Sequence, residues 1–274
     1  MKFSLNSLVL LAACSSMAAG NPIVHWKLDE SSGTVAADSS GNAIDGTWAG
    51  LSGAPGWMPG DGIDGGSVLF SGGNADVFIN DAFTSIEGTP LTLSTWVKTR
   101  TEGKKGLVYL GNGATGNSYY LMNVLSGAGR ATARNTIENA TPGIIINDGE
   151  WHHVLSVYVS PTERHVYVDG VLGGSNTAEV SEVNLTRFGV GGLTRGNPHV
   201  PVDLIDGQID DVAVWDRALS PVEAAALNGL GVLGAGNASD LEALMTGFNG
   251  LTTASIQGEE WEYTTGLTGS PGAS

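Results

Sequence analysis

Two acidic segments of this 274-residue chain have the residue types of a cation site. The first is Asp38-Ser39-Ser40-Gly41-Asn42, in which a carboxylate precedes a tight turn whose carbonyl groups can point inward. The second is the pair Asp210 and Asp211. Ca²⁺ prefers about six to eight oxygen ligands from carboxylates and carbonyls. Asp38, Gly41, Asn42, Asp210 and Asp211 are therefore candidate calcium ligands.

The pair Asp210 and Asp211 lies in a segment whose pattern predicts a strand covered on both sides. Strand alternation gives two faces, with Ile209, Asp211, Ala213 and Trp215 on one and Asp210, Val212 and Val214 on the other. A buried carboxylate is costly unless it is paired, so we expect a cationic group to meet at least one of them. The segment continues into a predicted helix, because Ser220 and Glu223 form a capping box around Pro221.

Other motifs that could do chemistry are weak. Gly111–Gly116 matches G-x-G-x-x-G, but a strand-like segment, Ser118–Val124, follows it where a nucleotide site needs a helix. This motif predicts a hairpin turn. His152 and His153 are neighbours on a predicted strand and would point to opposite faces, so they cannot chelate one metal. The chain has no Gly-x-Ser-x-Gly or His-Glu-x-x-His motif.

Composition indicates short strands joined by tight turns. Glycine is abundant, at 41 residues, and charged residues make up 15% of the chain. Strand patterns recur with turn signals every 8–12 residues or so, and one helix follows them, which predicts an all-β sandwich. The formal net charge of −16 argues against nucleic acid or an anionic membrane surface as partner, because both require a basic face. No stretch after the N-terminal segment is long enough for a transmembrane span.

Both ends of the chain differ from this pattern. Residues 1–20 are predicted to be an export signal peptide, with Lys2 before the apolar run Leu8–Ala13. Cleavage after Ser16-Met17-Ala18 would give a secreted protein, whereas a lipobox ending at Cys14 would give a lipid-anchored protein of the cell envelope. Cys14 is the only cysteine, so we expect no disulfide in the mature domain. Residues 230–274 are predicted to be a linker and tail, with a short helix and one strand as candidates.

Seven motifs occur in an order that resembles a known family. They are Trp26–Glu30 (WKLDE), Asp38–Asn42 (DSSGN), Leu93–Val97 (LSTWV), Trp151–Val154 (WHHV), Val166–Gly170 (VYVDG), Gly207–Val212 (GQIDDV) and Ala218–Glu223 (ALSPVE). Together they resemble the laminin-G-like jelly-roll domain of the concanavalin A-like lectin/glucanase superfamily, in its bacterial secreted form. The resemblance predicts a domain at residues 21–229, formed by two antiparallel sheets with the first and last strands as neighbours.

The resemblance also implies how the acidic segments meet. If the end strands are neighbours, Asp210 or Asp211 supplies a second carboxylate near Asp38, and relatives hold a structural calcium in such a place. The alternative is that Asp38 only caps its own turn and Asp210 accepts hydrogen bonds from backbone amides of the N-terminal loop. Glucanases share this fold, and laminarinase-type enzymes place their carboxylates on a Glu-x-Asp-x-Glu strand. No such pattern occurs here, so we expect no enzyme activity.

The sequence therefore predicts a non-catalytic domain, stabilised by calcium, that binds a polysaccharide or a cell-surface glycan or protein. The candidate ligand-binding residues lie on strands that could form a concave face: Tyr119, Asn123, Arg130, Arg134 and Asn135. Alternatively, Tyr119 or Tyr120 belongs to the core and the arginines are solvated. A structural or adhesive module without sugar binding is the competing hypothesis. A glycan-degrading enzyme with an unfamiliar site is a third.

Overall fold

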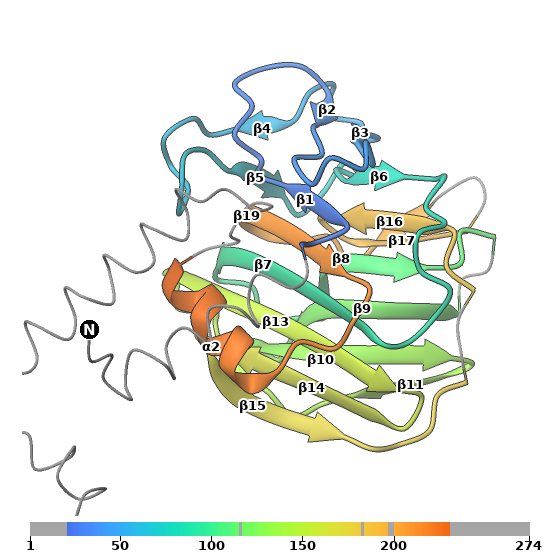
Figure 1. The fold of residues 1–274 in the computed structure, drawn as a ribbon. Coiled ribbons are helices and arrows are strands. Elements are labelled where there is room, and N and C mark those ends of the chain that lie inside the picture. The colour runs from blue at the N-terminus through green and yellow to red at the C-terminus, as the bar shows by residue number, and fades with distance from the viewer. Residues whose placement is uncertain (1–20, 115–116, 182–183, 197–199, 231–274) are drawn as a thin grey trace, which may run out of the picture. The chain divides into compact units, whose positions relative to one another are not determined.

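The computed structural model describes residues 21–114, 117–181, 184–196 and 200–230. Within them the chain forms two antiparallel sheets packed face to face, one two-stranded hairpin and one C-terminal helix (Figure 1). This confirms the predicted jelly-roll sandwich. The predicted signal peptide, Cys14 and the predicted helix and strand of the tail lie outside the described residues.

The first sheet, sheet A, carries the end strands of the domain. Its path is β15-β14-β13-β7-β19-β5-β4, and β1 also pairs with β19. The strands are β1 (Val24–Trp26), β4 (Gly56–Trp57), β5 (Val68–Ser71), β7 (Leu91–Thr99), β13 (Trp151–Ser160), β14 (Glu163–Val168), β15 (Val171–Asn176) and β19 (Asp206–Trp215). The pairing of β1 with β19 confirms that the first and last strands are neighbours.

The second sheet, sheet B, has the path β11-β10-β9-β8-β16-β6-β3-β2, and β12 also pairs with β10. Its strands are β2 (Val35–Ala36), β3 (Gly46–Trp48), β6 (Phe78–Asn80), β8 (Lys105–Gly111), β9 (Ser118–Leu125), β10 (Ala128–Asn135), β11 (Ile137–Ala140), β12 (Ile144–Ile145) and β16 (Arg187–Val190). β8 and β9 form an antiparallel pair on either side of the G-x-G-x-x-G segment, which confirms the predicted hairpin turn.

The main core lies between the two sheets and consists of apolar side chains from their inner faces. Trp26 packs there against Phe78 and Phe188, with ring centroids 6.3 and 4.6 Å away. Two smaller apolar clusters cover the outer faces. Helix α2 (Pro221–Leu230) packs on sheet A over Leu155, Tyr167 and Trp215. Ser220 and Glu223 form the predicted capping box at its start.

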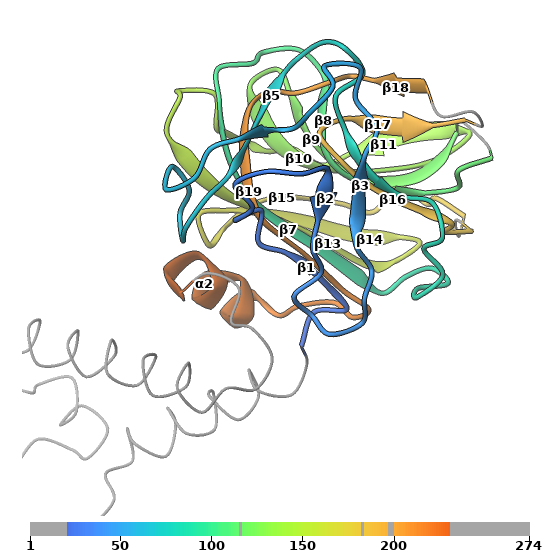
Figure 2. The ribbon, with the colours of Figure 1, turned by 90° about the horizontal axis from the view of Figure 1, so that it is seen from above.

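The outer face of sheet B is covered by the hairpin of β17 (Leu193–Arg195) and β18 (Val200–Val202), which the sequence analysis did not predict. Leu193 and Val202 of this hairpin pack on Tyr109, Tyr119 and Leu121. Helix α2 and the hairpin lie on opposite outer sides of the sandwich (Figure 2). Among the residues that the structure describes, no helix is long and apolar enough to cross a bilayer.

Candidate functional site

A β-bulge in β19 determines where Asp210 and Asp211 point. Between Asp210 and Ala213 the register with β7 shifts by one residue, and Asp211 has a positive φ of 50°. Ile209 and Val212 both face the main core, so strict alternation does not hold across the bulge. Both carboxylates therefore lie on the side of sheet A away from the core, which corrects the predicted assignment to opposite faces.

Each of these carboxylates has partners. Asp211 Oδ1 lies 3.0 Å from His25 Nε2, and both residues are buried. Asp210 is fully buried and accepts hydrogen bonds from the backbone amides of Ile63, at 2.6 Å, and of Asp211, at 2.8 Å. Burial, together with the nearby charges of Asp211 and Asp29, raises the pKa of Asp210 to about 7.

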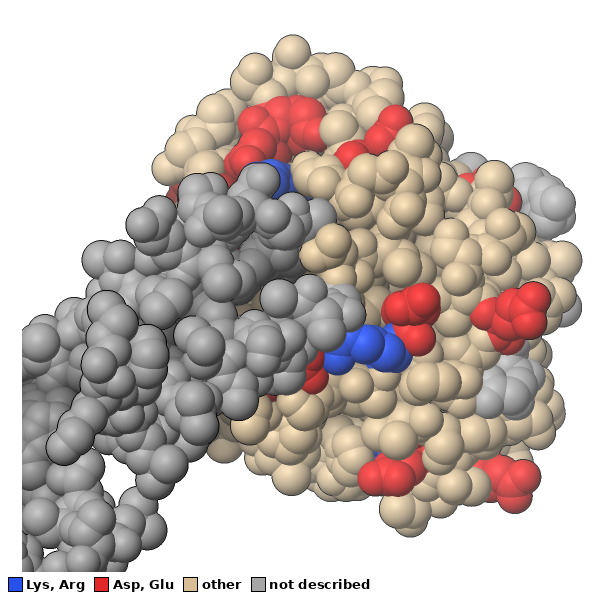
Figure 3. All heavy atoms as spheres, in the orientation of Figure 1, with Lys and Arg blue, Asp and Glu red and all other residues tan. Residues whose placement is uncertain are grey.

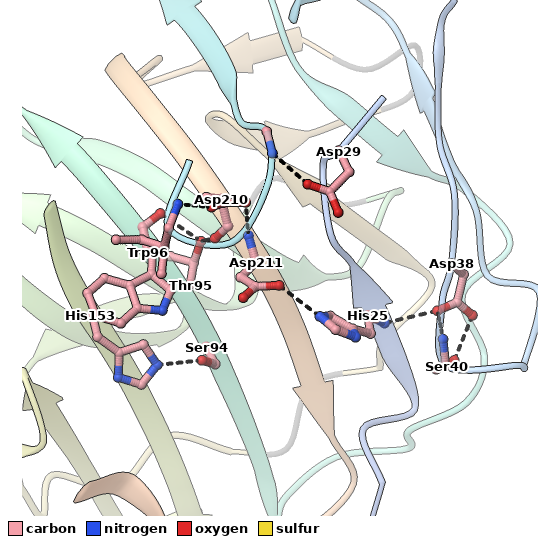
Figure 4. A network of polar contacts seen from close by, with 12 residues as sticks. His25, Asp29, Asp38, Ser40, Ser94, Thr95, Trp96, His153, Asp210 and Asp211 are labelled. Atoms are coloured by element: carbon pink, nitrogen blue, oxygen red, sulfur yellow. Dashed lines mark hydrogen bonds and ion pairs between the residues drawn. The ribbon is translucent and has the colours of Figure 1, made fainter. Parts of the chain in front are cut away.

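Asp38 caps its own turn. Its Oδ1 accepts hydrogen bonds from the backbone amides of His25 and Ser40, and its Oδ2 accepts from Ser40 Oγ and the amide of Ile44. Partial burial opposes ionisation, but these donors hold the pKa of Asp38 below its usual value. Figure 4 shows His25 between Asp38 and Asp211, contacting both.

The predicted calcium ligands thus do not converge on one point. Asn42 turns its amide nitrogen to Ile23 O and Ser40 Oγ, and a Cβ placed on Gly41 would meet no atom within 4 Å. Within the described ranges no group of three or more His, Cys, Asp or Glu side chains is arranged to hold a metal ion. The predicted set does not fit one calcium ion in this arrangement, and calcium binding stays a prediction.

A second acidic contact lies beside Asp210. Asp29 Oδ1 accepts the backbone amide of Gly66 at 2.6 Å, so Asp29, just after β1, and Asp210, on β19, hold the same loop, residues 61–67 (Figure 4). A Cβ on Gly62 would lie 2.6 Å from Asp210 Oδ2, and one on Gly65 would lie 2.1 Å from Asp29 Oδ1. The loop needs glycine at both positions, because its backbone passes so close to the carboxylates.

The predicted ligand face lies on the outer side of sheet B, with one exception. Tyr119 and Arg134 are register partners, as are Asn123 and Arg130, and all four side chains share that face. Asn135 is next to Arg134 and belongs to the opposite face, where its Oδ1 accepts a hydrogen bond from Ser118. The structure therefore brings four of the five predicted residues to one face.

Much of this face is covered. Tyr119 and Asn123 are fully buried, and Asn123 Oδ1 accepts a hydrogen bond from Thr132 Oγ1 at 2.7 Å. Arg130 donates to the carbonyl groups of Leu125 and Thr141. The Tyr119 ring packs against the Tyr109 ring, with 5.9 Å between the ring centroids. The guanidinium carbon of Arg134 lies over the Tyr119 ring, 6.0 Å from its centroid. Tyr119 is thus no platform on which a sugar can stack.

The accessible part of the face is a charged cluster that the sequence did not reveal. Lys104 contacts the carboxylate of Glu138 and lies 3.8 Å from that of Asp203. Tyr119 donates its hydroxyl hydrogen to Glu138 at 2.6 Å. The side chains of Lys104, Glu138 and Asp203 are 25%, 26% and 32% exposed, so solvent reaches all three. We call these three residues the Lys104 cluster.

Glu138 of the Lys104 cluster is not a proton donor of the kind that glycoside hydrolysis needs. Partial burial disfavours the Glu138 anion, but Lys104 and Tyr119 hydrogen-bond it and hold its pKa below the usual value. Glycosidases pair one ionised carboxylate with one whose pKa is raised. Asp210 has a raised pKa, but it lies fully buried in sheet A and both of its oxygens accept backbone amides.

Comparison with known proteins identifies the family to which this fold belongs. The family model described as the concanavalin A-like lectin/glucanases superfamily matches residues 71–225. The chain belongs to this superfamily. A search of curated proteins finds no significant match.

Solved structures of the same fold include domain 4 of AbnA, a GH43 extracellular arabinanase from Geobacillus stearothermophilus, in complex with arabinotriose. It has a TM-score of 0.61 and 19% identity, and the match covers 76% of this chain and 98% of that one. The binding domain of Paraclostridial Mosquitocidal Protein 1 has a TM-score of 0.57 and 16% identity, with 76% and 52% covered.

A third similar structure is the Botulinum neurotoxin serotype D ligand binding domain in complex with N-acetylneuraminic acid. It has a TM-score of 0.56 and 13% identity, with 79% of this chain and 52% of that chain covered. This chain thus spans about half the length of the two toxin domains. At these identities the likeness shows a common jelly-roll fold.

Proposed function

We propose that this superfamily domain binds glycans without cleaving them. The observation that carries the proposal is the Lys104 cluster, where one ammonium and two carboxylates gather, partly exposed, on the outer face of sheet B. Such groups donate to and accept from sugar hydroxyls, which need both kinds of partner. Domains of this fold described in complex with arabinotriose and with N-acetylneuraminic acid support the choice of ligand class.

The charge state of Glu138 supports binding without cleavage. Lys104 and Tyr119 stabilise the ionised form of Glu138, so this carboxylate is a poor proton donor to a glycosidic oxygen. It remains a good acceptor of hydrogen bonds from hydroxyl groups.

The buried state of Tyr119 favours a second candidate, a structural or adhesive module that contacts proteins and binds no sugar. Aromatic stacking is a usual source of affinity for sugar rings. On the part of the sheet B face that the structure describes, Tyr109 and Tyr119 are both 0% exposed.

The proposal includes two further parts. Residues 1–20 support export, with lipidation at Cys14 as the alternative to secretion. Calcium as a stabilising ion is the second part, and to bind near Asp210 it would have to replace the backbone amides that this carboxylate now accepts.

The test is binding of the full chain to a panel of neutral and acidic polysaccharides, in calcium and again in chelator. Glu138→Gln removes the charge that holds Lys104, and Glu87→Gln, at an exposed position, is the matched control. We expect Glu138→Gln to weaken binding about tenfold or more, as for loss of a charged hydrogen bond, and Glu87→Gln to leave it unchanged. Binding to no glycan in either buffer would favour the adhesive module, and release of new reducing ends would establish an enzyme.

A further inference from the structure

A pocket of about 390 Å³ opens on the outer side of sheet A, away from the Lys104 cluster. It lies where β7 ends and β19 begins, and Leu69, Lys98–Thr101, Gly149 and Asp206–Gln208 line it. Its volume falls within the range of about 300–1,000 Å³ typical of small-molecule sites. None of the candidate ligand-binding or calcium-binding residues lines it.

Leu69, Lys98 and Gln208, which line this pocket, belong to one row of cross-strand partners. Lys98 on β7 is the register partner of Trp151 on β13 and of Gln208 on β19, and Gln208 in turn pairs with Leu69 on β5. Directly paired residues of antiparallel strands project to the same side of the sheet. Four strands therefore present one continuous row of side chains.

Two cations of this pocket, Lys98 and Arg100, form no ion pair with the side chains that the structure describes. Lys98 Nζ lies 5.9 Å from the centre of the Trp151 ring, over its face, and this contact leaves the ammonium charge uncompensated. Within the described residues, neither Lys98 nor Arg100 forms an ion pair or a side-chain hydrogen bond. Such a pair is unusual on this protein, since acidic side chains outnumber basic ones on the visible described surface (Figure 3).

The backbone holds Arg100 in place. Gly149 has a φ of +87°, and a Cβ at this position would lie 2.5 Å from Arg100 Cζ, so the guanidinium packs directly on the glycine. Thr99 and Thr101 both donate their hydroxyl hydrogens to the carbonyl oxygen of Asp206, which fixes the opposite wall. The carboxylate of Asp206 lines the same pocket.

We propose that this pocket binds an acidic sugar unit, with its anionic group on Arg100 and Lys98 and its hydroxyl groups on the Asp206 wall. A planar guanidinium binds a carboxylate through two parallel hydrogen bonds, and an ammonium adds a point charge beside it. A sugar sulfate presents the same negative oxygens to both groups. This proposal rests on the glycan-binding function and names the ligand class of a second site.

The experiment measures binding of the full chain to three probes: polygalacturonate for a carboxylate, dextran sulfate for a sulfate, and arabinan as a neutral glycan. The variants are Lys98→Gln and Arg100→Gln at the pocket, Arg134→Gln on the sheet B face, and Lys27→Gln as an exposed control. Melting curves of each variant check that it is folded.

We expect Arg100→Gln and Lys98→Gln each to weaken binding of an acidic probe about ten- to a hundredfold. Arg100→Lys, which keeps the charge but loses the planar fork, should give an intermediate loss with polygalacturonate. Binding of arabinan should not change in the pocket variants, and Lys27→Gln should bind every probe as the wild-type protein does. The acidic probe that loses more affinity identifies carboxylate or sulfate as the group recognised.

Three results would overturn the proposal. If arabinan binds and neither acidic probe does, the pocket has no acidic ligand, while the glycan-binding function stands. If Arg134→Gln abolishes acidic binding and the pocket variants do not, the acidic sugar binds on sheet B. If no probe binds to the wild-type protein, this inference fails, and the wider polysaccharide panel decides the glycan-binding function separately.

Discussion

Replacement of Asp210 by asparagine tests the environment of the buried carboxylate most directly. In the folded protein the pKa of Asp210 is about 7 because of burial and the charges of Asp211 and Asp29. In an unfolded chain an aspartate has a pKa of about 3.9. Between these values the native state binds the proton more tightly than the unfolded state, so the free energy of unfolding falls as pH rises from about 4 to about 7.

The size of the effect follows from the two pKa values. The difference between the folded pKa of about 7 and the unfolded pKa of about 3.9 corresponds to a free energy of roughly 4 kcal/mol at pH 8. This is the cost of keeping the charged carboxylate in the folded protein. The side chain introduced by Asp210→Asn would carry no charge at any pH, but its amide group would meet one of the backbone amides of Ile63 and Asp211 unfavourably. That cost, about 1–3 kcal/mol, does not depend on pH.

The assay is urea unfolding of the wild-type protein and Asp210→Asn at pH 4 to 8 in chelator. We expect the stability of the variant relative to wild type to rise by up to about 4 kcal/mol between pH 4 and pH 8. Titrating groups that do not interact with Asp210 contribute equally to both proteins and cancel in this difference. A relative stability that is constant with pH would refute a raised pKa for Asp210.

Asp38→Asn is the control with the opposite sign. The pKa of Asp38 is lowered in the folded state, so its stabilising contribution is present above about pH 4 and is lost as pH falls through the folded pKa. This substitution should destabilise the protein at pH 8 and have a smaller effect in acid.

Three further predictions concern the metal and two histidines. If calcium binds near Asp210, calcium at pH 8 raises the melting temperature of the wild-type protein and of Asp38→Asn, but not of Asp210→Asn. Equal melting temperatures of the wild-type protein in calcium and in chelator would exclude the site. Burial lowers the pKa of His153 to about 4, so its NMR signals should stay those of the neutral ring until that pH, and its contribution to stability should fall by about 3 kcal/mol from pH 6.5 to pH 4. Burial opposes protonation of His152, but Asp169 and Asp148 raise its pKa. The ion pairs of His152 therefore stabilise the fold below about pH 6.5, and this stabilisation is lost as pH rises through the folded pKa. Asp169→Asn should lower the pKa of His152 in the same NMR titration, and an unchanged value would contradict the pairing.

The sequence predicted the long strands well, because alternation and turn residues mark them locally. β9 and the capped helix lie within a few residues of their predicted positions, and β13 carries His152 and His153 as predicted. The hairpin of β17 and β18 was missed, since its strands are short and Pro201 interrupts the second. The bulge at Asp211 was also missed, because a bulge depends on the register of a partner strand.

The candidate sites were harder to predict for the same reason. Alternation placed Tyr119 and Arg134 on one face correctly, but it cannot show that Leu193 and Val202 cover the tyrosine ring. Lys104 precedes β8 and Glu138 lies on β11, so their contact depends on the order β11-β10-β9-β8 in sheet B. The row of Trp151, Lys98 and Gln208 likewise requires the order β13-β7-β19, which no local pattern contains.

The position of β19 has a consequence for biosynthesis. This strand lies between β7 and β5 and also pairs with β1, yet it is the last strand of the described chain to be made. At about 5–20 residues per second, a ribosome needs roughly 10 to 40 seconds to reach Asp206 after it has made β1. During that interval β1, β5 and β7 have open edges, so a chain that stops before Asp206 should aggregate rather than fold into a smaller domain.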